Sequence, residues 1–176
     1  MAAMIEAAKA PDYPARIVLV MSNRPEAPGL DTARAAGIPV MAIDNRPYGK
    51  DREAHDKAMD AALRAAGVQV VALAGYMRII SPWLVQAWSG RMINIHPSLL
   101  PAYAGLNTHE RALEAGETEH GCTVHLVTEG VDEGPVLGQA RVPVLLGDTP
   151  EMLAARVLQA EHRLYPQALA EFCEGL

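Results

Sequence analysis

Short β-branched runs alternate with alanine-rich stretches along most of the chain, and this alternation limits the fold more than any other feature. It predicts helices from Ser81-Pro82 onward and at 28–36 and 51–66, and strands at 16–23, 38–44, 68–75 and 91–96. The run at 68–75 is apolar without alternation, which is typical of a central parallel strand covered on both faces. The first part of the chain therefore predicts repeated strand–helix units.

The second part of the chain carries more strand pattern. A helical patch at 108–115 interrupts a long connection, and strands at 122–128 and 135–144 follow. A final helix is expected at 149–172, broken or kinked at Pro166. The whole order predicts an α/β fold with a Rossmann-like, mainly parallel doubly wound sheet and added antiparallel strands.

Length and charge restrict the class of protein. The 176 residues suit one domain, 1–176, and half of them are hydrophobic, which is enough for a sizeable core. The net charge is −6 without a run of Lys or Arg, so we expect no nucleic-acid partner, because phosphate backbones need clustered cations. We also expect no membrane span and no signal peptide. Two cysteines suit a reducing cytosol, so we expect a cytoplasmic protein.

The segment Asn94–Pro101, with the sequence NIHPSLLP, reads as the end of an apolar strand that breaks into a proline-bounded turn. Residues two apart in a strand point the same way, so Asn94 and His96 present an amide and an imidazole on one face. The imidazole can move a proton near neutral pH, and the amide can hold a carbonyl oxygen as that oxygen gains charge. This pair suits acyl transfer to an amine.

This segment and its continuation to His109 resemble the signature of the folate-dependent formyltransferase family, and the resemblance extends over roughly 1–172. Within the family, the continuation is most similar to members that act on the amine of 5-phosphoribosyl-glycinamide. Members with other substrates generally have a different residue at the position of Pro97. The resemblance implies 10-formyltetrahydrofolate as co-substrate and no metal.

The resemblance also implies roles for individual residues. It assigns the catalytic steps to Asn94, His96 and Asp132, with Asp132 orienting and polarising His96. It places substrate contacts at Pro97 and Glu161. It places the formyl donor against Arg52, Met77, Arg78, Ile79, Ile80, Asn94, Thr128, Glu129, Gly130, Val131 and Asp132.

Several of these residues read differently without the resemblance. A lone histidine at a strand end is usually a structural hydrogen-bonding group, and Asp132 lies in a stretch that suits an ordinary turn. Arg52 and Glu161 read as solvated helix residues. The segment 76–80 reads as a strand end with one arginine whose charged head reaches water.

Four further residues raise the question of zinc: His109, His120, Cys122 and His125. Their spacing fits no compact ligand set, and in a strand His120 and Cys122 would face one way and His125 the other. We therefore expect no metal. Asn107 is a departure from the family, which usually has His at that position.

The beginning of the chain also departs from the family pattern. The family usually starts with a strand and a glycine-rich loop that holds the substrate phosphate, whereas this chain starts with what resembles the following helix. We expect the first strand to be lacking, an exposed sheet edge, and weaker binding of the ribonucleotide than of folate. A 10-formyltetrahydrofolate hydrolase and a truncated, non-catalytic folate-binding fragment stay open as alternatives, and so does a homodimer.

Overall fold

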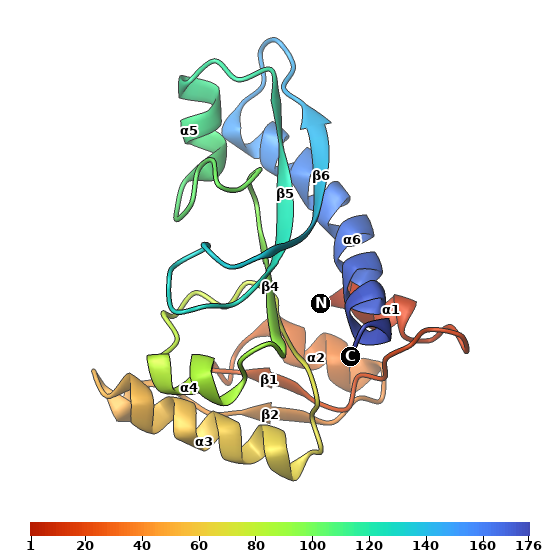
Figure 1. Ribbon diagram of the computed structural model, residues 1–176, viewed down its shortest axis with the longest axis vertical. Coiled ribbons are helices and arrows are strands. Elements are labelled where there is room, and N and C mark those ends of the chain that lie inside the picture. The colour runs from red at the N-terminus through yellow and green to blue at the C-terminus, as the bar shows by residue number, and fades with distance from the viewer.

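The computed structural model describes residues 1–176 as strands flanked by helices (Figure 1). The helices are α1 (Ala2–Ala7), α2 (Pro28–Ala35), α3 (Arg52–Ala65), α4 (Pro82–Ala87), α5 (Thr108–Glu114) and α6 (Pro150–Glu174), with a 3-10 turn η1 (Arg46–Tyr48). The strands are β1 (Val20–Ser22), β2 (Val40–Ala42), β3 (Val71–Leu73), β4 (Met92–His96), β5 (Glu119–Leu126) and β6 (Val136–Pro143).

The strands form two hydrogen-bonded sheets. β1 pairs with β2 in parallel, and the second sheet has the order β3-β4-β5-β6. In this second sheet β3 and β4 run parallel, while β5 and β6 add two antiparallel pairings. The predicted combination of parallel strands with added antiparallel strands is confirmed, although β1, β2 and β3 are shorter than their sequence patterns.

The strand pleat directs alternate side chains to helices on opposite faces. Val71 and Met92 pack with side chains of α3 and α4, whereas Ala72 and Ile93 pack with side chains of α1 and α6. Both faces are therefore covered by helices, and this explains why the run at 68–75 is apolar without alternation.

Three helices begin at the polar residues that the sequence suggests. The side chains of Asp51, Ser81 and Thr149 cap α3, α4 and α6, and each accepts a hydrogen bond from the backbone N–H three residues later. Pro82 and Pro150 follow two of these caps in the first turn, where the missing N–H of proline has no cost.

α6 continues without a break through Pro166, so of the two expected outcomes, a break or a kink, the break does not occur. Pro166 is buried, and its carbonyl accepts a hydrogen bond of 2.7 Å from the Tyr13 hydroxyl. The neighbouring Tyr165 hydroxyl reaches the carbonyls of Leu73 and Ile93, at 2.7 and 3.3 Å, and so attaches the helix to both β3 and β4. Tertiary packing outweighs the local penalty of the proline. No helix of the chain is both long and apolar enough to cross a membrane.

A gap separates the two sheets between β1 and β3. It holds an apolar cavity of about 640 Å³ lined mainly by residues 14–21 and 67–74. β3 is consequently the edge of its sheet and only half-buried, although its sequence is that of a central strand. The expected exposed edge is present.

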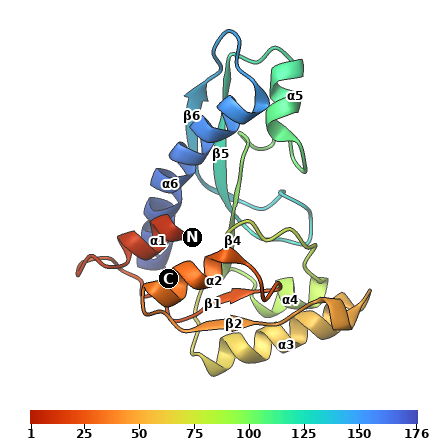
Figure 2. The ribbon, with the colours of Figure 1, turned by 180° about the vertical axis from the view of Figure 1, so that it is seen from behind.

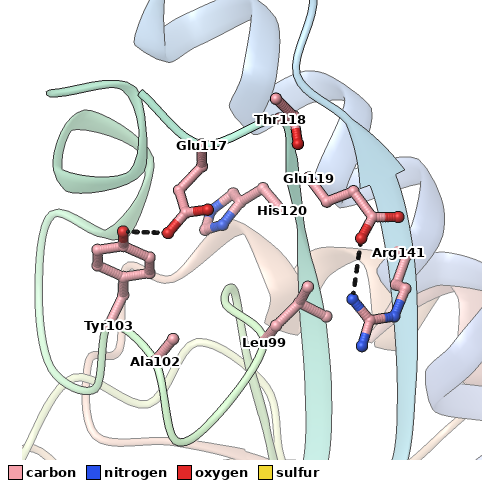
Figure 3. Close-up of a pocket in the computed structure, with 8 residues that line it drawn as sticks. All are labelled: Leu99, Ala102, Tyr103, Glu117, Thr118, Glu119, His120 and Arg141. Carbon is pink, nitrogen blue, oxygen red and sulfur yellow. Dashed lines mark hydrogen bonds and ion pairs between the residues drawn. The ribbon is translucent and has the colours of Figure 1, made fainter. Parts of the chain in front are cut away.

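α5 packs over β5 through two histidines. His109 Nδ1 lies 3.2 Å from His120 Nε2, and the ring of Tyr103 stands edge-on to His120 (Figure 3). Burial, with the nearby His109 as a second cause, lowers the pKa of His120 to about 4. The Tyr103 hydroxyl donates to Glu117 Oε1 at 2.7 Å, beside a cavity of about 170 Å³ (Figure 3). The histidine pair is a neutral packing contact.

The gap predicts an alternating pattern of amide hydrogen exchange. Val20 and Val71 donate their N–H groups to Pro39 and Arg91, at 3.0 and 2.9 Å, whereas the groups of the next residues in each strand point into the gap. We expect Met21 and Ala72 to exchange about tenfold faster or more than Val20 and Val71. Exchange measured by NMR tests this, and equal protection of the four amides would contradict it.

The burial of His120 predicts loss of stability in mild acid. The unfolded chain protonates this histidine near pH 6.5, but the folded chain does so only near pH 4. Between these values the unfolded state binds more protons, so the free energy of unfolding falls as the pH falls. In urea titrations at pH 7 and pH 5, His120→Gln should lose less stability than the parent chain. The same change at the exposed His162 is the control, and equal losses in both variants would refute the assignment.

Candidate active site

Asn94 and His96 lie on the same face of β4, as the alternation predicts. They stand opposite His125 and Thr123 of β5, while Ile95 on the other face stands opposite Val124. Ile95 and Val124 pack under α6, so Asn94, His96, Thr123 and His125 face away from that helix. The strand pair thus separates an apolar face from a polar one.

The ring of His96 is buried and held at both nitrogens. Nε2 lies 2.9 Å from the Tyr103 carbonyl, and Nδ1 lies 3.3 Å from Asp132 Oδ2. The His96 residue is 6% exposed. Because both neighbours are oxygen acceptors, this geometry suits a ring that donates from both nitrogens.

The position of Asp132 is fixed by its turn conformation and by hydrogen bonding of its side chain. Its backbone has φ of 56°, a left-handed conformation that aspartate tolerates better than most residues. Its Oδ2 also accepts a hydrogen bond of 3.0 Å from the N–H of Gly105, in the connection after β4. The turn interpretation is therefore correct, and the carboxylate also joins His96 to the 97–107 connection.

His125 is the member of this cluster that the sequence did not indicate as catalytic. Its Nε2 lies 3.3 Å from Asn94 Nδ2 and 3.5 Å from Asp132 Oδ1. The only signal was its predicted position on the face of β5 opposite to His120 and Cys122, and that position is correct. Register between two distant strands was needed to place it beside Asn94.

The segments expected to hold the formyl donor lie on one side of the cluster. Figures 1 and 2 both show the β5–β6 loop on the same side as α4 and the segment after β3. Gln86 of α4 donates to Glu129 of that loop at 3.0 Å. The side chains of Met77, Ile79 and Val131 are exposed, so both segments present apolar surface.

The buried Asp56 anchors the segment after β3. Its Oδ2 accepts a hydrogen bond of 2.7 Å from the N–H of Ser81, and Asp56 is 1% exposed. Tyr76 also reaches α3, where its hydroxyl contacts the sulfur of Met59 at 3.6 Å. Met77 to Ile80 therefore lie between two residues, Tyr76 and Ser81, that are attached to α3.

Of the other expected site residues, Arg52 and Glu161 lie apart from this cluster, whereas Pro97 adjoins it. Arg52 is exposed at the start of α3, and its side chain makes no hydrogen bond or ion pair within the chain. Glu161 lies on α6, where burial raises the pKa of its carboxyl and the nearby amino group of Met1 opposes that shift. Pro97 directly follows β4, and its carbonyl accepts a hydrogen bond from the Thr108 hydroxyl at 2.7 Å.

The four residues considered for zinc divide between separate places. His109 and His120 are in contact, while Cys122 is buried beneath α6 and His125 belongs to the polar face. Asn107 has φ of 55° at the start of α5, a conformation that asparagine adopts readily. The departure from the family at Asn107 thus fits its backbone.

Known proteins with similar sequences agree with the function that this geometry suggests. Residues 1–169 match the family model described as formyl transferase. The chain is 47% identical over 173 residues to trifunctional purine biosynthetic protein adenosine-3 of Bos taurus, with 98% of this chain covered but only 17% of that protein. It is 44% identical to phosphoribosylglycinamide formyltransferase of Escherichia coli, with 98% and 81% covered.

A solved structure gives the same result. The crystal structure of phosphoribosylglycinamide formyltransferase from Brucella melitensis is 55% identical in sequence and has a TM-score of 0.94, with 100% of this chain and 90% of that chain covered. The fold, the polar face of β4 and β5, and the match over residues 1–169 together show that this chain belongs to the formyl transferase family.

Proposed function

We propose that this chain transfers a formyl group from 10-formyltetrahydrofolate to the amine of 5-phosphoribosyl-glycinamide, in purine biosynthesis. The observation that carries the proposal is the convergence of Asn94, His96 and Asp132 on one polar face in a chain of the formyl transferase family. The names of the Escherichia coli and Brucella melitensis relatives support the choice of amine. Both reactants are small molecules, which agrees with a net charge of −6 and no cationic run.

The reaction forms one C–N bond and breaks another. The amine nitrogen attacks the formyl carbon, and the carbonyl oxygen gains negative charge. Asn94 Nδ2 donates a hydrogen bond to that oxygen. The C–N bond to the folate then breaks, the carbonyl re-forms, and the proton lost by the amine reaches the leaving folate nitrogen with the help of His96.

Asp132 stabilises the charged form of His96 during this transfer. Its carboxylate lies 3.3 Å from Nδ1, so positive charge on the ring is compensated while Nε2 handles the proton. The Tyr103 carbonyl holds Nε2 in the absence of substrate, and a reacting oxygen or nitrogen would take its place. No metal is needed for any of these steps.

The donor would lie across the exposed segments 77–80 and 128–131, with Arg52 at the folate tail. The flat, polar ring of a folate suits backbone groups exposed beyond a strand end, next to the apolar side chains of Met77 and Ile79. Pro97 and Glu161 would contact the ribonucleotide. The whole of 1–176 would act as one domain, and its two free cysteines agree with a cytoplasmic location.

A formyl-transfer assay tests the proposal directly. The purified chain is given 10-formyltetrahydrofolate with and without the amine substrate, and loss of donor and appearance of formylated amine are both followed. We expect donor consumption only when the amine is present. Consumption without the amine would indicate a hydrolase, and donor binding without consumption would indicate a non-catalytic folate-binding protein.

His96→Ala should lower turnover by roughly 10²–10⁴-fold, because the proton transfer loses its carrier. Donor binding should stay within a few-fold of the parent, measured by calorimetric titration with a folate analogue. His162→Ala, which removes an exposed histidine of α6, is the matched control and should leave turnover unchanged. Near-normal turnover in His96→Ala would remove this residue from the mechanism.

Asp132→Asn should lower turnover about tenfold to a hundredfold, since a hydrogen bond to a charged group contributes about 1.5–3 kcal/mol. Asparagine keeps the size of the side chain and an oxygen for the N–H of Gly105, so the loop should stay in place. Glu133→Gln neutralises an exposed carboxylate in the same loop and serves as control. Equal rates in the two variants would contradict the role of Asp132.

A further inference from the structure

The place of His125 beside Asn94 does not follow from its spacing in the sequence or from its residue type. It is 3% exposed, it stands directly across the strand pair from Asn94, and its ring contacts three groups. We propose that His125 is a positioning residue, which orients the amide of Asn94 so that one N–H remains free for the formyl oxygen. This inference rests on the proposed function.

The proton on the His125 ring is located by its first contact. Nδ1 lies 2.9 Å from the carbonyl oxygen of Leu126. A carbonyl can only accept, so Nδ1 carries the hydrogen and donates it. In the neutral ring Nε2 then has no hydrogen and presents a lone pair.

The lone pair on Nε2 determines which way the Asn94 amide turns. Nε2 lies 3.3 Å from Asn94 Nδ2, and an acceptor can be satisfied only by an N–H. The amide nitrogen must therefore face His125, with Oδ1 turned away. One hydrogen of Nδ2 is used by Nε2, and the second is left as the donor that the mechanism needs.

Oxygen and nitrogen of an asparagine amide have nearly the same shape, so packing alone does not choose between the two orientations. With the amide reversed, Asn94 would present a carbonyl oxygen to the developing oxyanion, and the two would repel. The partner that distinguishes N–H from C=O is thus the acceptor on His125. Its effect on the reaction acts through Asn94, with no contact to the reacting atoms.

The third contact, with Asp132, shows why this carboxylate pairs with His96 and does not pair with His125. Asp132 Oδ1 lies 3.5 Å from Nε2, but both atoms are acceptors when the ring is neutral. Asp132 Oδ2 stays with His96 Nδ1 at 3.3 Å and with the N–H of Gly105. The same protonation state therefore supplies both the orientation of Asn94 and an undivided carboxylate for His96.

Two variants of His125 distinguish the loss of its hydrogen-bond acceptor from the loss of the packing that its ring provides. His125→Leu removes the acceptor, and His125→Gln offers an amide oxygen in its place. We expect His125→Leu to lower kcat about tenfold to a hundredfold, somewhat less than removal of an oxyanion donor itself, with KM for both substrates changed by less than about threefold. His125→Gln should recover most of the loss. His120→Leu removes a buried histidine from the other face of β5 and is the matched control for folding and turnover.

A double-mutant cycle tests whether His125 affects turnover through Asn94. If His125 acts through Asn94, then His125→Leu should cost almost nothing further in a chain that already carries Asn94→Ala. Additive losses would overturn the proposal, and so would unchanged kcat in His125→Leu. A loss of kcat that Gln does not recover would also overturn it, because a structural role would then account for the effect.

One measurement does not depend on turnover, so it separates this inference from the proposed function. In ¹⁵N-labelled chain, the side-chain amide of Asn94 should give one set of signals, with one of its two hydrogens slowed in exchange. In His125→Leu that protection should be lost, while in His125→Gln it should be kept. The same signals in the parent and in His125→Leu would refute the orientation by His125, even if the chain transfers formyl groups as proposed.

Discussion

The pairing of β4 with β5 is the interaction on which the rest of this site depends. Its register places Asn94 opposite His125 and His96 opposite Thr123, and it places Ile95 opposite Val124 on the other face. A shift by one residue would turn the polar groups toward α6 and expose the apolar ones. The burial of Ile93 and Val124 under α6 therefore fixes the orientation of Asn94 and His96 as well.

Much of the fold can be predicted from local sequence, because its signals act over a few residues. The caps Asp51, Ser81 and Thr149 mark helix starts, and the apolar run at 68–75 marks a strand with helices on both faces. The same reasoning fails at Pro166, where contacts with Tyr13 and the sheet hold the helix together. Tertiary contacts of this kind have no local signature.

Some contacts of the candidate site can likewise be predicted from local sequence, and others cannot. Asn94 and His96 are two residues apart in one strand, so their shared face follows from the sequence alone. The contact of Asp132 with His96 was expected only from the family resemblance, since residues 36 positions apart carry no local sign of contact. The contact of His125 with Asn94 depends on strand register and became evident only in three dimensions.

Asp132 has a consequence for how this family can change. One of its oxygens lies 3.3 Å from Nδ1 of His96 and also accepts a hydrogen bond from the N–H of Gly105, in the connection after β4. A change in that connection that moves Gly105 also moves the carboxylate beside His96. Under the proposed function, the shape of the 97–107 connection and the proton chemistry of His96 are therefore coupled, and evolution or design can alter one only together with the other.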